Sequence, residues 1–293
     1  MPVVRPHWVG DGFNVYPLFG SMAFTKEISP FLMLDYAAPK TFHATTQKRG
    51  VGQHPHRGFE TVTMAFKGEV EHADSEGNRG IIGPGDVQWM TAASGIIHEE
   101  FHSTNFAKEG GVFEMVQLWV NLPAEHKMSP PSYQPILASS IPSVALPSSA
   151  GSVSVIAGAF AGVAGPARTF TPINMWTVTL KAGRAMTAPI PAGHTTVVFV
   201  RSGAVTTAGD GGGEGKARIV QGQISVFSRE GESCELEAGE EGDAEVVVLS
   251  GMPIEEEIAA RGPFVMNTKA ELREAMEDYS SGRMGKHFKS TGR

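Results

Sequence analysis

The clearest pattern in the sequence lies in two short stretches, GQHPHRGFET at residues 52–61 and GIIHEEFH at residues 95–102. In a β-strand, side chains two residues apart point to the same face. Both stretches repeat metal-binding residue types at that interval: His54 and His56 in the first, and His98, Glu100 and His102 in the second. The chain between the stretches is long enough for other strands to bring them side by side. Inside a barrel, two such strands would converge imidazoles and a carboxylate on one point.

Three histidines and one carboxylate form a donor set for a divalent metal. Neutral imidazole and carboxylate suit Fe(II), Mn, Ni, Cu or Zn, and four protein ligands leave coordination positions open for catalysis. A lone His-x-His more often packs in an ordinary way than binds a metal. Here the second stretch adds a histidine and an acid that also lie two residues apart and so share one strand face. Strand alternation also selects Glu100 over Glu99, which would face away from His98. We therefore expect a metal site made by His54, His56, His98 and Glu100.

Other residues of the same types stay open as alternatives. Glu60 and His102 share the expected parity and are candidates for neighbouring or alternative ligands. Two further histidines, His43 and His72, are expected to be ordinary surface or rim residues.

The composition is that of an all-β protein. Of 293 residues, 41% are hydrophobic, and 35 glycines and 19 prolines mark many turns. Short apolar or alternating runs recur on both sides of a proline- and serine-rich stretch, which favours a small barrel or sandwich in each half. We expect an N-terminal metal-binding domain over 1–130, a linker over 131–150, and a second domain over 151–293 that ends in a helix and a tail. The capping box of Thr268 and Glu271 predicts the start of this helix.

Charge and cysteine content exclude several functions. Lys and Arg number 24 against 31 Asp and Glu, a net charge of −7, so the chain has no basic field for nucleic acid. The single cysteine, Cys234, cannot form an internal disulfide. No apolar run approaches the ~18 residues of a membrane span, and the opening residues show no apolar segment behind a basic start. We expect a cytoplasmic monomer with no membrane partner and no direct nucleic-acid partner.

Longer motifs extend beyond these histidines. They are HWVGDGF (7–13), FLMLD (31–35), HPHRGFET (54–61), PGDVQWMTA (84–92), QLWVNL (117–122) and GPFVMNT (262–268). His54-x-His56 and Gly95-x-x-His98 resemble the two short motifs of the cupin superfamily, and the full set resembles the pirin family, whose members carry two cupin barrels. The resemblance is strong over residues 5–122 and weaker over 130–250.

The resemblance implies a bicupin in which the N-terminal barrel keeps one divalent metal per chain. Carried over residue by residue, the ligands are His54, His56, His98 and Glu100. Fe(II) is the first expectation, with Mn, Ni, Cu or Zn as alternatives, since the same ligand set accepts them all. In the second barrel His194 stands without a His-x-His partner, so that barrel is expected to hold no metal.

The resemblance also implies an activity. Pirin-like proteins resemble quercetin 2,3-dioxygenases, which open the central ring of a flavonol with O2 and release CO. Glu100 would accept the proton of the flavonol 3-hydroxyl in such a reaction. The alternative is a metal- and redox-dependent regulatory protein that acts through a protein partner, either a transcription factor or a metabolic enzyme.

Overall fold

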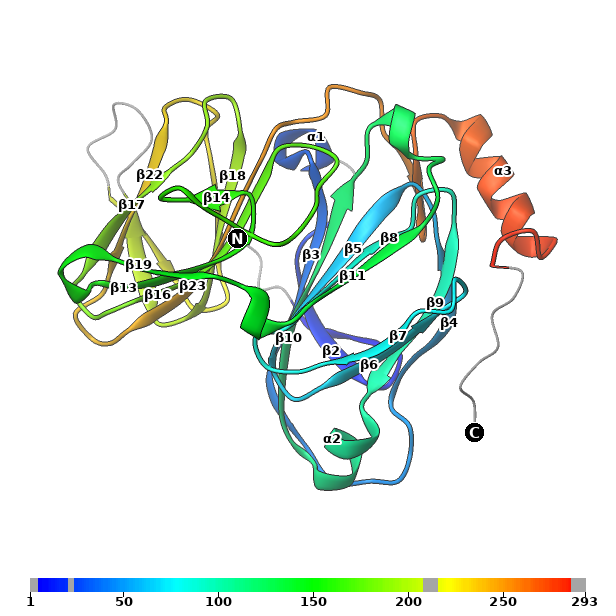
Figure 1. The fold of residues 1–293 in the computed structure, drawn as a ribbon, viewed down its shortest axis with the longest axis horizontal. Coiled ribbons are helices and arrows are strands. Elements are labelled where there is room, and N and C mark those ends of the chain that lie inside the picture. The colour runs from blue at the N-terminus through cyan, green and yellow to red at the C-terminus, as the bar shows by residue number, and fades with distance from the viewer. Residues whose placement is uncertain (1–4, 21–23, 208–215, 286–293) are drawn as a thin grey trace. The chain divides into compact units, whose positions relative to one another are not determined.

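The computed structural model describes residues 5–20, 24–207 and 216–285. The chain divides into two compact units, each described separately below. The first comprises Met1–Phe24, Phe31–Ala138 and Ile254–Arg293, and the second comprises Thr25–Pro30 and Ser139–Pro253. Strands dominate both units (Figure 1), so the expected all-β class with two barrels and a short C-terminal helix is confirmed.

The first unit is built from two main antiparallel sheets and a separate two-stranded β24–β25 sheet. The larger sheet has the order β1-β2-β3-β10-β5-β8-β11, and the smaller has the order β4-β9-β6-β7. The elements are β1 (His7–Val9), β2 (Phe13–Phe19), β3 (Phe31–Phe42), β4 (Gly50–His56), β5 (Phe59–Lys67), β6 (Val70–Asp74), β7 (Arg79–Ile82), β8 (Val87–Thr91), β9 (Ile96–His102), α2 (Thr104–Glu109), β10 (Gly111–Asn121), a 3-10 turn (Ala124–His126), β11 (Ser132–Ile136), β24 (Ala259–Arg261), β25 (Phe264–Met266) and α3 (Lys269–Ser280).

The interior of this first barrel changes from apolar to polar along its axis. One end is closed by an apolar floor, a buried cluster of Phe13, Val15, Ala37, Phe42, Ala65, Val70, Ile82, Phe106, Phe113 and Met115. Above it a polar row crosses four strands in register: Asp35 on β3, Gln117 on β10, Thr63 on β5 and Gln88 on β8. Residues paired across antiparallel strands share a face, so these four side chains point the same way. The polar row faces the smaller sheet, because the Thr63 hydroxyl lies 3.4 Å from Oε1 of Glu100 on β9.

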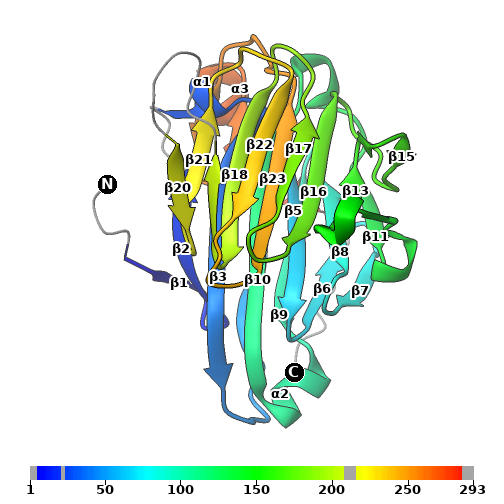
Figure 2. The ribbon, with the colours of Figure 1, turned by 90° about the vertical axis from the view of Figure 1, so that its left-hand side faces the viewer.

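The second unit repeats the two-sheet plan with an apolar interior. Its two main sheets have the orders β12-β13-β16-β23-β18-β21 and β17-β22-β19-β20, and β14 and β15 form a separate pair. Figure 2 labels most of these strands. The elements are α1 (Thr25–Ile28), two 3-10 turns (Ala138–Ser140 and Pro147–Ser149), β12 (Ser143–Ala145), β13 (Gly151–Ala157), β14 (Ala159–Phe160), β15 (Val163–Ala164), β16 (Ile173–Leu180), β17 (Ala185–Pro189), β18 (Thr195–Ser202), β19 (Ala204–Thr207), β20 (Ala217–Val220), β21 (Ile224–Phe227), β22 (Ser233–Ala238) and β23 (Ala244–Gly251). Valines, leucines and Trp176 fill the space between the sheets.

The boundaries of the units differ from the expected ones. The stretch expected as a linker contains β11, which pairs with β8, and β12, which pairs with β13. Residues 254–293 belong to the first unit, although we expected them in the second domain. The reason is backbone pairing at the turn after β4: Arg57 N donates to Pro263 O at 3.3 Å, and Val265 N donates to Arg57 O at 3.0 Å. Lys127, buried, also donates from Nζ to Val265 O at 3.0 Å.

The C-terminal helix begins as its capping box predicts. Thr268 Oγ1 accepts from Glu271 N at 3.2 Å, and Glu271 Oε2 accepts from Thr268 N at 2.7 Å. The expected tail beyond residue 285 lies outside the described residues. Among the helices of the described part of the chain, none is long and apolar enough to cross a membrane.

Candidate metal centre

β4 and β9 bring three of the predicted ligands together. Their antiparallel register places His54 opposite His98, and His56 lies two residues further along β4. The ring centroids of His54 and His98 are 4.2 Å apart, and that of His56 lies 4.9 Å from each of the other two. One ring nitrogen from each histidine lies within 4.8 Å of the others. Three imidazoles from two neighbouring strands thus face a common point.

The buried imidazoles are held in their neutral form. Burial lowers the pKa of His56 and of His98 well below the usual value, and the adjacent His54 lowers both further. Both ring nitrogens of His98 have no hydrogen-bond partner among the described residues, whereas the backbone of Pro263 contributes a hydrogen bond to His56. Nδ1 of His54 lies 2.8 Å from the carbonyl oxygen of Gly52, so it carries the proton and Nε2 offers a lone pair. Neutral imidazoles with unused nitrogens around one point fit a divalent transition metal.

Glu100 belongs to a second, overlapping group. It lies two residues beyond His98 on β9 and opposite His72 on β6. His72, His98 and Glu100 each place one candidate ligand atom within 4.8 Å of the other two. Glu100 is not grouped with His54 and His56 at that distance among the described residues, so His98 is the residue common to both groups.

Comparison with known proteins identifies the family. The family model for Pirin matches residues 12–120, and the model for the Pirin C-terminal cupin domain matches residues 175–285. Human pirin is 34% identical over 89% of this chain and 84% of its own length. The chain belongs to the pirin family.

Closer bacterial relatives of this pirin-family chain carry the name of an enzyme. A Pseudomonas aeruginosa protein provisionally named a quercetin 2,3-dioxygenase is 51% identical over 94% of each chain. A crystal structure of quercetin 2,3-dioxygenase from Acinetobacter baumannii is 51% identical, with a TM-score of 0.90 over 96% of this chain and 95% of that one.

His72 is the residue of this pirin-family site that the sequence analysis misplaced. We expected a surface or rim residue, but His72 is 1% exposed. Its Nε2 lies 3.3 Å from Oδ2 of Asp74, and its Nδ1 lies 2.9 Å from Nε2 of Gln88. Both ring nitrogens are therefore engaged, and the ring packs 5.5 Å from that of His98. The signal in the sequence was His72-x-Asp74, which places an acid on the same strand face as the imidazole. His43 is exposed, as predicted.

Tyr133 was also missed, because it lies in the stretch expected as a linker. Its ring stacks on His72 with centroids 5.2 Å apart and planes 12° apart. Burial raises the pKa of Tyr133 to about 12, with further contributions from Asp74 and Glu100. The phenol therefore stays neutral and forms a flat wall behind His72.

The two alternative ligands lie away from the centre. Glu60 alternates with Thr61 and Thr63 on β5, so it faces the opposite side of the sheet from the polar row. It accepts a 2.7 Å hydrogen bond from Thr91, and burial raises its pKa to about 7. His102 does face the interior, but its Nε2 donates to Gly12 O at 2.9 Å and its ring packs in the apolar floor.

Glu99 and His194 have other partners. Glu99 is buried on the other face of β9 from Glu100, with Lys48 Nζ 3.8 Å from its Oε1. In the second unit, His194 Nδ1 lies 2.9 Å from the hydroxyl of Ser250. Within the described residues, no group of three His, Cys, Asp or Glu close enough for a metal includes His194. That the second barrel holds no metal stays a prediction.

Proposed function

We propose that this pirin-family chain is a metal-dependent dioxygenase that opens the central ring of a flavonol with O2 and releases CO, with Fe(II) as its metal. The observation that carries the proposal is the cluster of neutral imidazoles with unused nitrogens beside Glu100. The 51% identity to a solved quercetin 2,3-dioxygenase over 96% of this chain supports the substrate class.

His54, His56, His98 and Glu100 would hold the metal. When bound, the metal supplies a redox-capable Lewis acid, which lets a flavonol react with ground-state O2 despite their difference in spin. The chain's own contribution is to hold the reactants in one orientation and to move one proton.

Glu100 is the proposed proton acceptor. A carboxylate at this position can take the proton from the flavonol 3-hydroxyl and return it when the ester product leaves. Thr63, whose hydroxyl is 3.4 Å from Oε1 of Glu100, also lies 2.8 Å from Oε1 of Gln117. The polar row thus holds Thr63 beside the carboxylate and limits the directions in which the carboxylate can turn.

Aromatic side chains next to His56 are the proposed wall for a flat substrate. The ring of Trp119 lies 5.3 Å from that of His56 and 4.3 Å from that of Phe59. Phe59 is fully buried, whereas Trp119 is half-buried. A planar aromatic substrate would gain contact area there while displacing water from the site.

The test uses full-length protein loaded with Fe(II) under anaerobic conditions. We expect flavonol addition to produce a shifted absorption band before O2 is admitted, and O2 uptake matched one-to-one by CO release afterwards. Protein that retains metal and binds flavonol but consumes no O2 would contradict the proposal. The His194→Ala variant serves as the matched control, since His194 belongs to no group of candidate metal ligands within the described residues.

A further inference from the structure

A buried lysine of the first unit has no part in the reaction proposed above. Lys127 follows the 3-10 turn after β10 and is 2% exposed. Its Nζ donates to Gly58 O at 2.6 Å, to Asn121 Oδ1 at 2.7 Å and to Val265 O at 3.0 Å. An ammonium group carries three donors and no acceptor. Every donor of Lys127 is therefore used within the chain.

The three oxygens come from segments that are far apart in the sequence. Gly58 lies in the turn after β4, Asn121 ends β10, and Val265 is the central residue of β25. Gly58 has a φ of +89°, and a Cβ at this position would overlap Val265 O. Glycine therefore lets this carbonyl approach the turn closely. Buried oxygens that converge in this way need donors between them, and the compact ammonium group of Lys127 supplies three.

The segment that contains Val265 also contacts the predicted metal ligand His56. Pro263 O accepts from Arg57 N at 3.3 Å, and the backbone of Pro263 contributes a hydrogen bond to His56. Because proline has no N–H, its carbonyl oxygen accepts this bond and the imidazole donates it. One ring nitrogen of His56 thus carries the proton, which leaves the other nitrogen with a lone pair for a metal.

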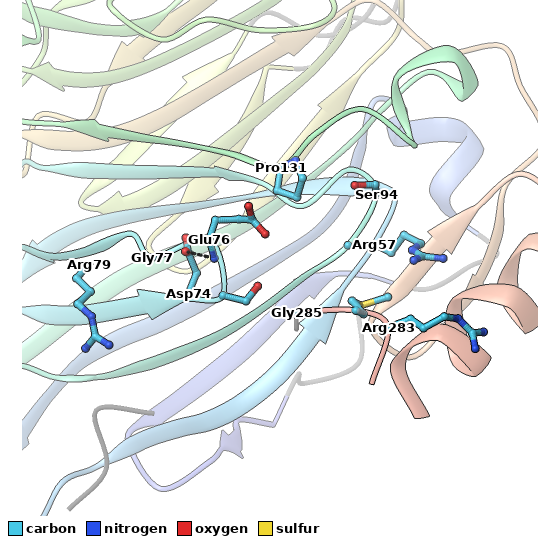
Figure 3. Close-up of a pocket in the computed structure, with 12 residues that line it drawn as sticks. Arg57, Asp74, Glu76, Gly77, Arg79, Ser94, Pro131, Arg283 and Gly285 are labelled. Atoms are coloured by element: carbon cyan, nitrogen blue, oxygen red, sulfur yellow. Dashed lines mark hydrogen bonds between the residues drawn. The ribbon is translucent and has the colours of Figure 1, made fainter. Parts of the chain in front are cut away.

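The side chain of Arg57 forms a second link between this turn and the C-terminal segment. Its Nη2 donates to Oδ2 of Asp278 on α3 at 2.8 Å. Arg57 also lines a pocket of about 730 Å³, where Figure 3 shows it at the same end as Arg283 and well away from Arg79. The ion pair holds α3 against the turn, whereas Lys127 holds backbone carbonyls on both sides of the contact with His56.

We propose that Lys127 is a positioning residue for the metal centre. By holding Gly58 O and Val265 O together, its ammonium group keeps Pro263 O against the imidazole of His56. It thereby fixes which nitrogen of His56 faces the point shared by the three imidazoles. The inference rests on His56 being a metal ligand, as proposed above, and it is independent of the substrate and of the reaction.

The experiment compares the full parent chain with Lys127→Met at pH 6, where Lys127 is charged because burial lowers its pKa only to about 7. Nitrogen-15 spectra of the metal-free protein report the tautomer of His56. We expect one tautomer in the parent and a mixture of both in Lys127→Met. Chelator competition with Zn(II) alone measures metal affinity, which should fall about 10- to 100-fold. Lys127→Gln, which keeps two N–H donors, provides the same readouts if Lys127→Met does not fold.

Glu114→Met is the matched control, because it also replaces a buried charged side chain of the first unit with methionine. Glu114 is 1% exposed and accepts a 2.8 Å hydrogen bond from Tyr36, towards the other end of β10 from Asn121. We expect this variant to lower the melting temperature and to leave both the His56 tautomer and the Zn(II) affinity unchanged.

Two results would overturn the role of Lys127. One is an unaltered His56 tautomer in a folded Lys127 variant, and the other is an equal change in Glu114→Met. Neither measurement uses flavonol or O2, so a failure of the proposed dioxygenase activity leaves this test intact. A parent chain that binds no Zn(II) would contradict the metal centre, while the tautomer of the metal-free protein would still test Lys127.

Discussion

The two barrels differ most clearly in one row of four residues. In the first barrel the polar row Asp35, Gln117, Thr63 and Gln88 crosses β3, β10, β5 and β8. In the second, Val155, Trp176, Val248 and Val198 cross β13, β16, β23 and β18 in the same fashion, and all four are buried in the apolar core. In the second barrel this row is filled by apolar side chains. The strand plan therefore does not require the polar row of the first barrel, whose burial costs free energy.

The largest expected effect separates the barrels by metal content. We expect His98→Ala to weaken metal binding by at least about 100-fold, since His98 belongs to both groups of candidate ligands. His194→Ala, in the second barrel, should leave the metal content unchanged. Metal analysis of dialysed protein measures both variants, and far-ultraviolet circular dichroism checks that each remains folded. Two metals per parent chain, or full metal occupancy in His98→Ala, would contradict the assignment of a single metal to the first barrel.

A second expected effect distinguishes the two faces of β9. Glu100→Gln cannot accept a proton, so turnover per bound metal should fall about 100- to 10,000-fold. Raising the pH should restore part of the rate, because the flavonol 3-hydroxyl then ionises without help. Glu99→Gln is the control, as Glu99 lies on the other face. Unchanged turnover per metal in Glu100→Gln would place the base elsewhere.

Asp35 makes the free energy of unfolding depend on pH, which the apolar row of the second barrel cannot do. Burial raises its pKa to about 6 from 3.8, partly offset by His7. Between about pH 4 and pH 6 the folded state keeps a proton that the unfolded chain releases, so the free energy of unfolding falls as pH rises through this window. The shift corresponds to about 3 kcal/mol. Asp35→Asn should therefore be more stable than the parent above pH 6 and similar to it near pH 4.

Thermal unfolding of metal-free protein at several pH values measures this difference. A constant gap between parent and Asp35→Asn at all pH values would show that Asp35 titrates normally.

The smallest expected effect concerns His72, which either packs against the centre or binds the metal. Because both of its nitrogens are engaged, we expect it to position His98 through ring packing. His72→Ala should weaken metal binding about 10- to 100-fold, whereas His72→Phe, which keeps a ring against Tyr133, should retain most of the affinity. Equal losses in both variants would identify His72 as a ligand. The electron paramagnetic resonance spectrum of Cu(II)-loaded protein provides a second readout of ligand number.

Strand alternation predicted the convergence of His54, His56 and His98 because it depends only on positions within two strands. Alternation could not predict how deep in the barrel a side chain lies. His102 faces the interior, as alternation requires, yet it packs in the apolar floor. Alternation is also interrupted at a turn. Glu60 follows the turn at Arg57 and Gly58, so its side chain faces the opposite side of the sheet from the polar row. The position of His72 depends on the pairing of β6 with β9, and composition alone made the strand that carries Tyr133 look like a linker.

The pairing of Arg57 with Pro263 and Val265 has a consequence for how the protein is made. A ribosome releases the N-terminal part of a chain first, and His54, His56, His98 and Glu100 all emerge well before residue 263. The turn after His56 stays without its backbone partners until residues 263–265 have been synthesised, which is after the whole second unit. The metal-binding barrel is therefore completed only after the second barrel has emerged, and a gene fragment that stops after codon 130 would encode the ligands without the segment that anchors them.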